Sequence, residues 1–187
     1  MSDREQLRQH LLTHSVKTGD FVLKSGLRSS WFIDSKQTVC SPEAMVLVAE
    51  AILDLLPDDA TAIGGLTMGA DPVSFITAGI AASKGRMLRA FSVRKEVKDH
   101  GAGGRIAGAL QPGDRVVITE DTVTRGTSLL EAAHAVQDFG AEVVLLTSLV
   151  DRGGSVAEMA RREGLAFKAV FTAPDLGFDY EGGISFE

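Results

Sequence analysis

Short apolar segments alternate with helical segments over the last two thirds of the chain, and this alternation limits the possible fold more than any other feature. Apolar and β-branched residues gather in runs at 62–66, 87–93, 116–119, 143–150 and 169–172. Stretches with helical spacing lie between these runs, at 71–83, 127–139 and 155–163. Strands that alternate with helices favour a parallel sheet covered by helices on both faces. The expected fold is therefore α/β, with a central mostly parallel sheet flanked by helices.

The length and composition fit one packed domain. The chain has 187 residues, of which 44% are apolar and 24% charged, and this balance excludes a disordered or fibrous chain. We therefore treat 1–187 as a single domain. The net charge of −6 disfavours binding to nucleic acid or to an anionic membrane surface. A single cysteine, together with the lack of a membrane-length apolar run or a signal-peptide pattern, predicts a cytoplasmic protein.

The N-terminal region follows a different pattern from the alternating part. A capping box at 2–5, followed by leucines at helical spacing, predicts a helix over 3–13. Two short runs of alternating apolar residues within 16–34 predict a small β-hairpin outside the main sheet. The sequence Ser41-Pro42-Glu43 then predicts a helix start, and that helix ends before Pro57.

The strongest local motif is an apolar strand that runs into two acids and then into a loop rich in hydroxyl groups, at 116–128. The carboxyl end of a strand is where ligands bind in open α/β sheets, and the N-terminus of the next helix offers free N–H groups to a phosphate. Hydroxyl groups in the loop add donors, Gly126 allows close approach of the backbone, and Glu120 and Asp121 can accept hydrogen bonds from sugar hydroxyls. These features suit a sugar phosphate.

A plain turn is the alternative interpretation of the same motif. Thr127 or Ser128 would then only cap the helix, and the two acids would be solvated. Adjacent carboxylates after an apolar strand repel each other, however, and this favours a site with hydroxyl or cationic partners.

This stretch resembles the binding motif for 5-phosphoribosyl 1-pyrophosphate (PRPP) of the type I phosphoribosyltransferases. The resemblance implies that Glu120 and Asp121 hold the ribose hydroxyls, although position 120 is glutamate where many members have aspartate. It also implies that the 5-phosphate binds the loop that follows, at Thr124, Arg125, Gly126, Thr127 and Ser128.

A second segment carries charge into a long glycine-containing loop at 95–108, a composition that predicts neither a firm helix nor a firm strand. The sequence of residues 94–101 resembles the mobile catalytic loop of the orotate phosphoribosyltransferases. Cationic donors in such a loop can neutralise a departing pyrophosphate, and here they are Arg94, Lys95, Lys98 and His100. A solvated surface loop is the alternative.

Three further segments resemble the same family. Residues 21–34 are similar to its N-terminal hood, which residues 1–40 would form, and the similarity implies base contacts from Lys24, Phe32 and Ile33. Arg152 is similar to the arginine that meets the carboxylate of the base. Residues 65–72 are similar to the pyrophosphate loop, but Met68 and Gly69 stand where many relatives carry a lysine, so the contact must come from backbone N–H groups or from another cation.

The resemblance implies an orotate phosphoribosyltransferase, which joins orotate to PRPP and gives orotidine 5′-monophosphate and pyrophosphate in pyrimidine biosynthesis. Asp121 and the four cationic loop residues would be catalytic, with His100 able to pass a proton to pyrophosphate. Mg²⁺ would be held mainly by the substrate and not by a dedicated set of protein ligands. Family members imply a homodimer whose mobile loop reaches the neighbouring site.

Two alternatives stay open at this point. One is a type I phosphoribosyltransferase for another base, because only the hood and Arg152 indicate orotate. The other is a regulator of the same fold that senses PRPP without turnover.

Overall fold

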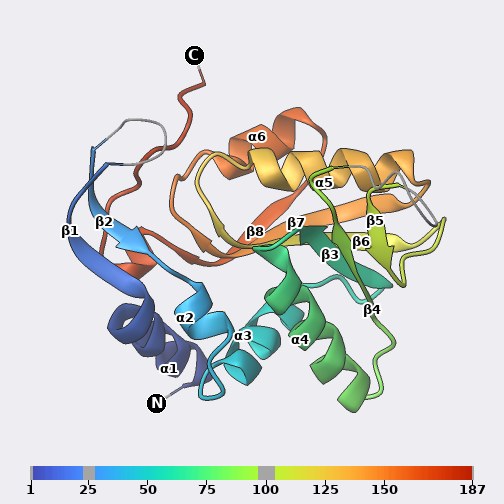
Figure 1. The fold of residues 1–187 in the computed structure, drawn as a ribbon, viewed down its shortest axis with the longest axis horizontal. Helices are drawn as coiled ribbons and strands as arrows, with labels where there is room; N and C mark the ends of the chain where they lie inside the picture. Colours follow the sequence, from blue (N-terminus) through green and yellow to red (C-terminus); the bar gives the residue numbers. More distant parts are fainter. Residues whose placement is uncertain (1, 23–27, 97–103, 187) are drawn as a thin grey trace.

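The computed structural model describes residues 2–22, 28–96 and 104–186. Their main element is a six-stranded sheet in the order β5-β4-β3-β6-β7-β8 (Figure 1). Five of its strands are parallel, and β5 pairs with β4 in the antiparallel sense. The strands are β3 (Ala62–Leu66), β4 (Arg89–Val93), β5 (Ile106–Gly108), β6 (Arg115–Val123), β7 (Glu142–Asp151) and β8 (Phe167–Thr172). The predicted α/β fold with a central mostly parallel sheet is confirmed.

Helices cover both faces of this sheet, which explains why its central strands are almost continuously apolar. On one face lie α3 (Met45–Leu53) and α4 (Ala70–Ser83), and on the other lie α5 (Thr127–Asp138) and α6 (Val156–Arg162) (Figure 1). The buried apolar side chains accordingly form two clusters, one with Ile63, Val117 and Phe171 and one with Ile118, Leu146 and Phe91.

The N-terminal elements pack beside the first of these faces. α1 (Asp3–His10) begins at Ser2, whose hydroxyl accepts the Glu5 N–H at 3.3 Å, and a π-helical turn (Leu11–Ser15) follows it. β1 (Val16–Val22) and β2 (Arg28–Ile33) then form an antiparallel hairpin separate from the main sheet, as the sequence predicts. In β2 the side chains alternate between buried and exposed, which places Trp31 and Ile33 in the core.

The structure corrects three boundaries. β5 occupies part of the 95–108 loop for which the glycine content predicts no firm strand, because residues 106–108 find an open edge of β4 to pair with. A short helix, α2 (Lys36–Val39), is not foreseen in the sequence. The helix predicted from Ser41 begins at Met45, since residues 42–44 form turns, with the Ser41 carbonyl accepting the N–H groups of Ala44 and Met45.

The C-terminal segment leaves β8 through a 3-10 turn (Pro174–Leu176) and then passes beside the β1–β2 hairpin (Figure 1). The Glu181 carboxylate joins the two, because it accepts the Ser30 N–H at 3.2 Å and the Ser30 hydroxyl at 2.9 Å. Within the described residues, no helix has both the length and the apolar character needed to cross a membrane.

Candidate active site

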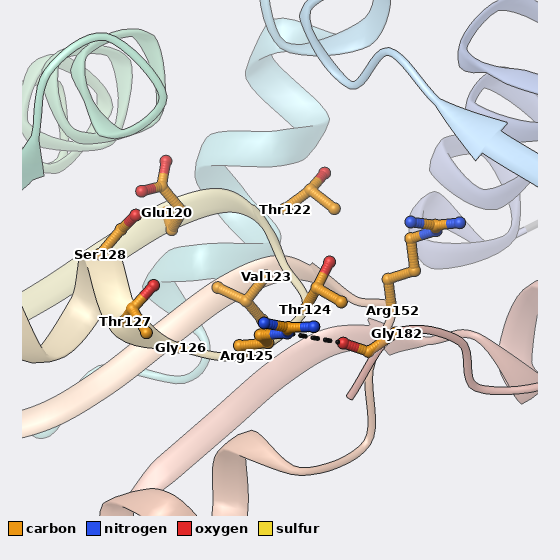
Figure 2. A pocket seen from close by; sticks show the side chains of 10 residues that line it. All are labelled: Glu120, Thr122, Val123, Thr124, Arg125, Gly126, Thr127, Ser128, Arg152 and Gly182. Carbon is orange, nitrogen blue, oxygen red and sulfur yellow. Dashed lines mark hydrogen bonds between the residues drawn. The ribbon is translucent and has the colours of Figure 1, made fainter. Parts of the chain in front are cut away.

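A cavity of about 530 Å³ opens at the carboxyl end of β6, beside the N-terminus of α5. In the view of Figure 2, Glu120 and Ser128 lie toward one end of its lining and Arg152 toward the other, with Thr124 and Arg125 between them. Seven of the sequence-predicted binding residues line it together with Thr122, Val123 and Gly182, which the sequence analysis does not single out; the predicted ones are Glu120, Thr124, Arg125, Gly126, Thr127, Ser128 and Arg152.

The loop between β6 and α5 depends on a glycine. Gly126 has a φ of +78°, a conformation that favours glycine, and a Cβ there would also displace the end of the Met159 side chain, 2.6 Å away. Gly126 is also the residue that precedes α5, and no side chain caps that helix. The alternative in which Thr127 or Ser128 serves only as a cap therefore does not hold. The first N–H groups of α5 face the cavity end of the helix, where an anion is stabilised.

The two acids lie inside β6 and not after it, because the strand continues to Val123. Both are nearly buried, Glu120 at 8% exposed and Asp121 at 6%. Burial raises the pKa of Glu120 well above its ordinary value, and the neighbouring charge of Asp121 raises it further. A carboxyl group in this state needs a cationic or hydroxyl partner nearby to be charged.

Asp121 has such partners, and both come from the N-terminal region. Its Oδ2 accepts the Ser35 hydroxyl at 2.7 Å and pairs with the Lys36 ammonium at 2.6 Å. Burial alone lowers the pKa of Lys36, but the hydrogen bond and charge of Asp121 raise it overall. Ser35 and Lys36 are missing from the sequence prediction, although the acid pair itself signals that a cation must lie close.

The loop after β3 lies against the same acids. The Thr67–Met68 peptide in this loop is cis. A Cβ on Gly69 would come 1.8 Å from Glu120 Oε1 and 2.8 Å from Asp121 Oδ1, so a side chain there would displace the two carboxylates. Met68, in the same loop, is 71% exposed. The predicted pyrophosphate loop therefore adjoins the predicted ribose site, as one PRPP molecule requires.

Arg152 lies at the end of β7 with a side chain only 6% exposed. Its Nη2 donates to the Ser29 hydroxyl at 2.6 Å and to the Trp31 carbonyl at 2.8 Å, and it pairs with the Glu181 carboxylate at 3.3 Å. The guanidinium also lies over the Trp31 ring, 5.0 Å from its centroid. The Nε of Arg152 is buried and has no partner among the described residues. A buried donor of this kind is free to bind a ligand.

The C-terminal segment closes this end of the cavity, and the sequence analysis does not anticipate it. Arg125 Nε donates to the Gly182 carbonyl at 3.2 Å (Figure 2). A Cβ on Gly183 would lie 2.2 Å from the Gly153 carbonyl oxygen, so the chain passes close over the turn after β7. The Gly182-Gly183 pair is the sequence signal that could have indicated such a close approach.

Other predicted residues lie elsewhere. Phe32 is 41% exposed and packs against the Phe21 ring, whereas Ile33 is 7% exposed and belongs to the core. Their side chains point to opposite faces of β2, so they do not meet at one planar base, and neither lines the cavity. The expected contact between the Ile33 side chain and a base is therefore wrong, since strand alternation turns that side chain inward.

Arg94 and Lys95 follow β4, where the Arg94 N–H donates to the Arg105 carbonyl at 2.8 Å and Lys95 is exposed. They do not line the cavity. Lys24, Lys98 and His100 lie outside the described residues.

Comparison with known proteins places this site in a family, although no family model matches the chain. Orotate phosphoribosyltransferases from Nostoc and from Streptomyces avermitilis are each 40% identical to it, over 95% and 94% of this chain and 87% and 98% of their own. Among solved structures, the Mycobacterium tuberculosis orotate phosphoribosyltransferase with Fe(III) dicitrate is 39% identical with a TM-score of 0.84, covering 95% of this chain and all of that one. The same enzyme in complex with PRPP gives a TM-score of 0.80 at 36% identity, with the same coverage. By sequence and by structure, the chain belongs to the orotate phosphoribosyltransferase family.

Proposed function

We propose that the cavity at the end of β6 is where this chain performs the reaction of its family, the transfer of a phosphoribosyl group from PRPP to orotate. The products are orotidine 5′-monophosphate and pyrophosphate. The observation that carries the proposal is the convergence of three recognition elements on one cavity: the uncapped N-terminus of α5, the buried acid Glu120 and the buried Arg152.

The phosphate and the ribose of PRPP fit the two adjoining parts of this cavity. The 5-phosphate binds the loop before α5, where hydroxyls of Thr124, Thr127 and Ser128 and the helix N–H groups supply donors. Glu120 and Asp121 accept the ribose hydroxyls. The negative charge of Asp121 also stabilises the positive charge that develops at the anomeric carbon when pyrophosphate leaves.

Orotate binds at the Arg152 end. The base carboxylate pairs with the guanidinium, whose buried Nε still lacks a partner among the described groups. The hood formed by residues 1–40 covers the base, with Lys24 and Phe32 as its contacts. Support for this arrangement comes from the hydrogen bonds that tie Arg152 to Ser29 and Trp31 of β2.

The loop after β4 supplies cations to the departing pyrophosphate. Arg94 and Lys95 begin this loop, and Lys98 and His100 continue it. In this proposal the protein is a homodimer and the loop serves the site of the neighbouring subunit. The positions of Arg94 and Lys95 outside the lining of their own cavity are consistent with that arrangement.

Mg²⁺ bound to PRPP would screen the charge of its pyrophosphate. The acid pair offers hard oxygen atoms, but one Asp121 oxygen is already occupied by Ser35 and Lys36. Among the described residues no group of three His, Cys, Asp or Glu could hold a metal ion. These residues fit a cation held mainly by substrate oxygens and water, as Mg²⁺ prefers. We place the enzyme in the cytoplasm, where the exposed free thiol of Cys40 stays reduced.

The decisive assay follows orotate consumption by the purified protein, with PRPP and Mg²⁺ added together and each omitted in turn. Orotate should disappear only when both are present. Uracil should be a poor substrate, because it lacks the carboxylate that pairs with Arg152 and leaves the buried Nε of that residue without an acceptor. Equal turnover of uracil and orotate would refute the base assignment, and no turnover with any base would refute the transfer reaction.

A further inference from the structure

The predicted pyrophosphate loop carries no cation of its own. It runs Leu66-Thr67-Met68-Gly69-Ala70-Asp71 between β3 and α4, and its single charged residue is an acid. Pyrophosphate is a multiply charged anion, and backbone N–H groups beside two carboxylates do not balance that charge. Apart from Mg²⁺ and the loop of the neighbouring subunit, the charge at this loop therefore has to come from a cation elsewhere in the same chain.

Lys36 is the cation that the fold brings there. Its ammonium lies 2.6 Å from Asp121 Oδ2, and a Cβ on Gly69 would lie 2.8 Å from the other oxygen of the same carboxylate. The loop, the acid and the lysine thus form one contiguous group, assembled from three separate segments. Helix α2, which the sequence does not foretell, carries the lysine into this position.

Within the Lys36–Asp121 ion pair, the acid is buried and the lysine is partly exposed, so the lysine is accessible to a ligand. The Asp121 side chain is 8% exposed, whereas that of Lys36 is 45% exposed. An ammonium group has three N–H donors, and the described hydrogen bond to Asp121 uses one of them. Lys36 therefore lies at the boundary between the buried acids and solvent, with donors left for an anion.

We propose that Lys36 binds the pyrophosphate group of PRPP, and free pyrophosphate in the reverse reaction, while it keeps its hydrogen bond to Asp121. Lys36 in this way supplies the charge that the loop at Met68 and Gly69 lacks. This assignment rests on the proposed function, since it concerns the donor of that same reaction. Lys36 forms no covalent bond in the proposal and adds only electrostatic stabilisation.

A purely positioning role predicts a different pattern of kinetics. If Lys36 only holds Asp121 in place, its loss weakens binding of the ribose. PRPP and orotidine 5′-monophosphate both contain this ribose, so the affinity for both should fall. If Lys36 binds pyrophosphate, its loss lowers the affinity for PRPP and for pyrophosphate but leaves the affinity for the nucleotide unchanged. The reverse reaction separates the two roles, because its two substrates have separate KM values.

The experiment uses Lys36→Gln, which removes the charge and keeps a hydrogen-bond donor for Asp121. We expect KM for pyrophosphate and for PRPP to rise about tenfold or more, as for the loss of a charged hydrogen bond, and KM for orotidine 5′-monophosphate to change less than about twofold. Lys84→Gln is the matched control, since Lys84 is also half-exposed and paired with a carboxylate, that of Glu50, but is not among the residues that line the cavity. Its KM values should equal those of the wild type.

A second-site variant tests directly whether a cation at another position can replace Lys36. Met68 is 71% exposed, so a lysine there has room and disturbs no packing. Met68→Lys added to Lys36→Gln should recover most of the lost pyrophosphate affinity, because the cation returns to the same anion from the other side. A lysine that served only to hold Asp121 would not be replaced in this way.

Calorimetric titration of the unliganded protein with magnesium pyrophosphate provides a measurement independent of turnover. The wild type should bind about tenfold more tightly than Lys36→Gln. A parallel rise in KM for pyrophosphate and nucleotide, or equal pyrophosphate binding by wild type and variant, would overturn the inference. If the wild type binds pyrophosphate in a Lys36-dependent way but consumes no orotate, the proposed function fails and this inference stands.

Discussion

Gly153 lies where two loops of the site touch, and an added methyl group there should disturb both. A Cβ at position 153 would lie 1.8 Å from the Thr124 carbonyl oxygen, whereas real Cβ atoms essentially never approach closer than 3.0 Å. Gly153→Ala therefore forces a separation of at least about 1.2 Å between backbone segments. The neighbouring Arg152 N–H already holds this turn to β6 through the Val123 carbonyl at 2.8 Å, so the chain cannot simply swing aside.

The displacement falls on Thr124, in the loop proposed to bind the phosphate, and on Arg152, the residue proposed to bind the base. A shift of about 1 Å in a positioning group costs about a hundredfold in rate, so kcat/KM for PRPP should fall about 10²-fold. Overpacking of this kind also destabilises a protein by about 1–3 kcal/mol, and each kcal/mol lowers Tm by roughly 2–4 °C at this chain length. Initial rates of orotate consumption and a thermal unfolding curve measure the two effects on the same sample.

Gly79→Ala is the control for this substitution. Gly79 lies within α4, and nothing lies within 4 Å of where its Cβ would be. Alanine there should leave kcat/KM unchanged and stabilise the helix by up to about 1 kcal/mol. If Gly153→Ala keeps wild-type kcat/KM and Tm, the close contact between the two loops does not exist in solution and the reasoning is refuted.

Three further predictions concern charge in the site. Lys95→Ala or Lys98→Ala should lower kcat about 10²-fold with little change in PRPP affinity, because cations aimed at developing charge act in the transition state; unchanged kcat in steady-state assays would make the loop a surface feature. If the loop serves the neighbouring subunit, mixing inactive Asp121→Asn and Lys98→Ala chains should restore about a quarter of wild-type activity after exchange, and mixed dimers without activity would contradict it. The pKa of Glu120 is higher in the folded than in the unfolded protein, so the free energy of unfolding should fall as pH rises above 4.5. Glu120→Gln should reduce this pH dependence in denaturant titrations. An unchanged pH dependence would show that the pKa of Glu120 is ordinary.

The sequence alone was sufficient for the alternating architecture and for the loop that leads from β6 into α5. Strand and helix periodicity predicts β3 at 62–66 to the residue, and α4 and α5 to within one residue at each end. The loop at 124–128, which lines the cavity, can also be predicted, because its residues are consecutive in the chain and their geometry is set by local turn and helix-start chemistry. Local chemistry of this kind requires no knowledge of distant residues.

Only the tertiary structure decided which distant groups complete the site. Lys36 and Ser35 reach Asp121 across 85 and 86 positions of sequence, and Glu181 reaches Ser30 across 151. The inward orientation of Ile33 and the continuation of β6 through the two acids also could not be predicted from sequence, since both depend on pairing with a neighbouring strand. Contacts between residues far apart in the chain are fixed by how the layers pack. The sequence around a charged residue therefore does not identify the distant partner that packing places beside it.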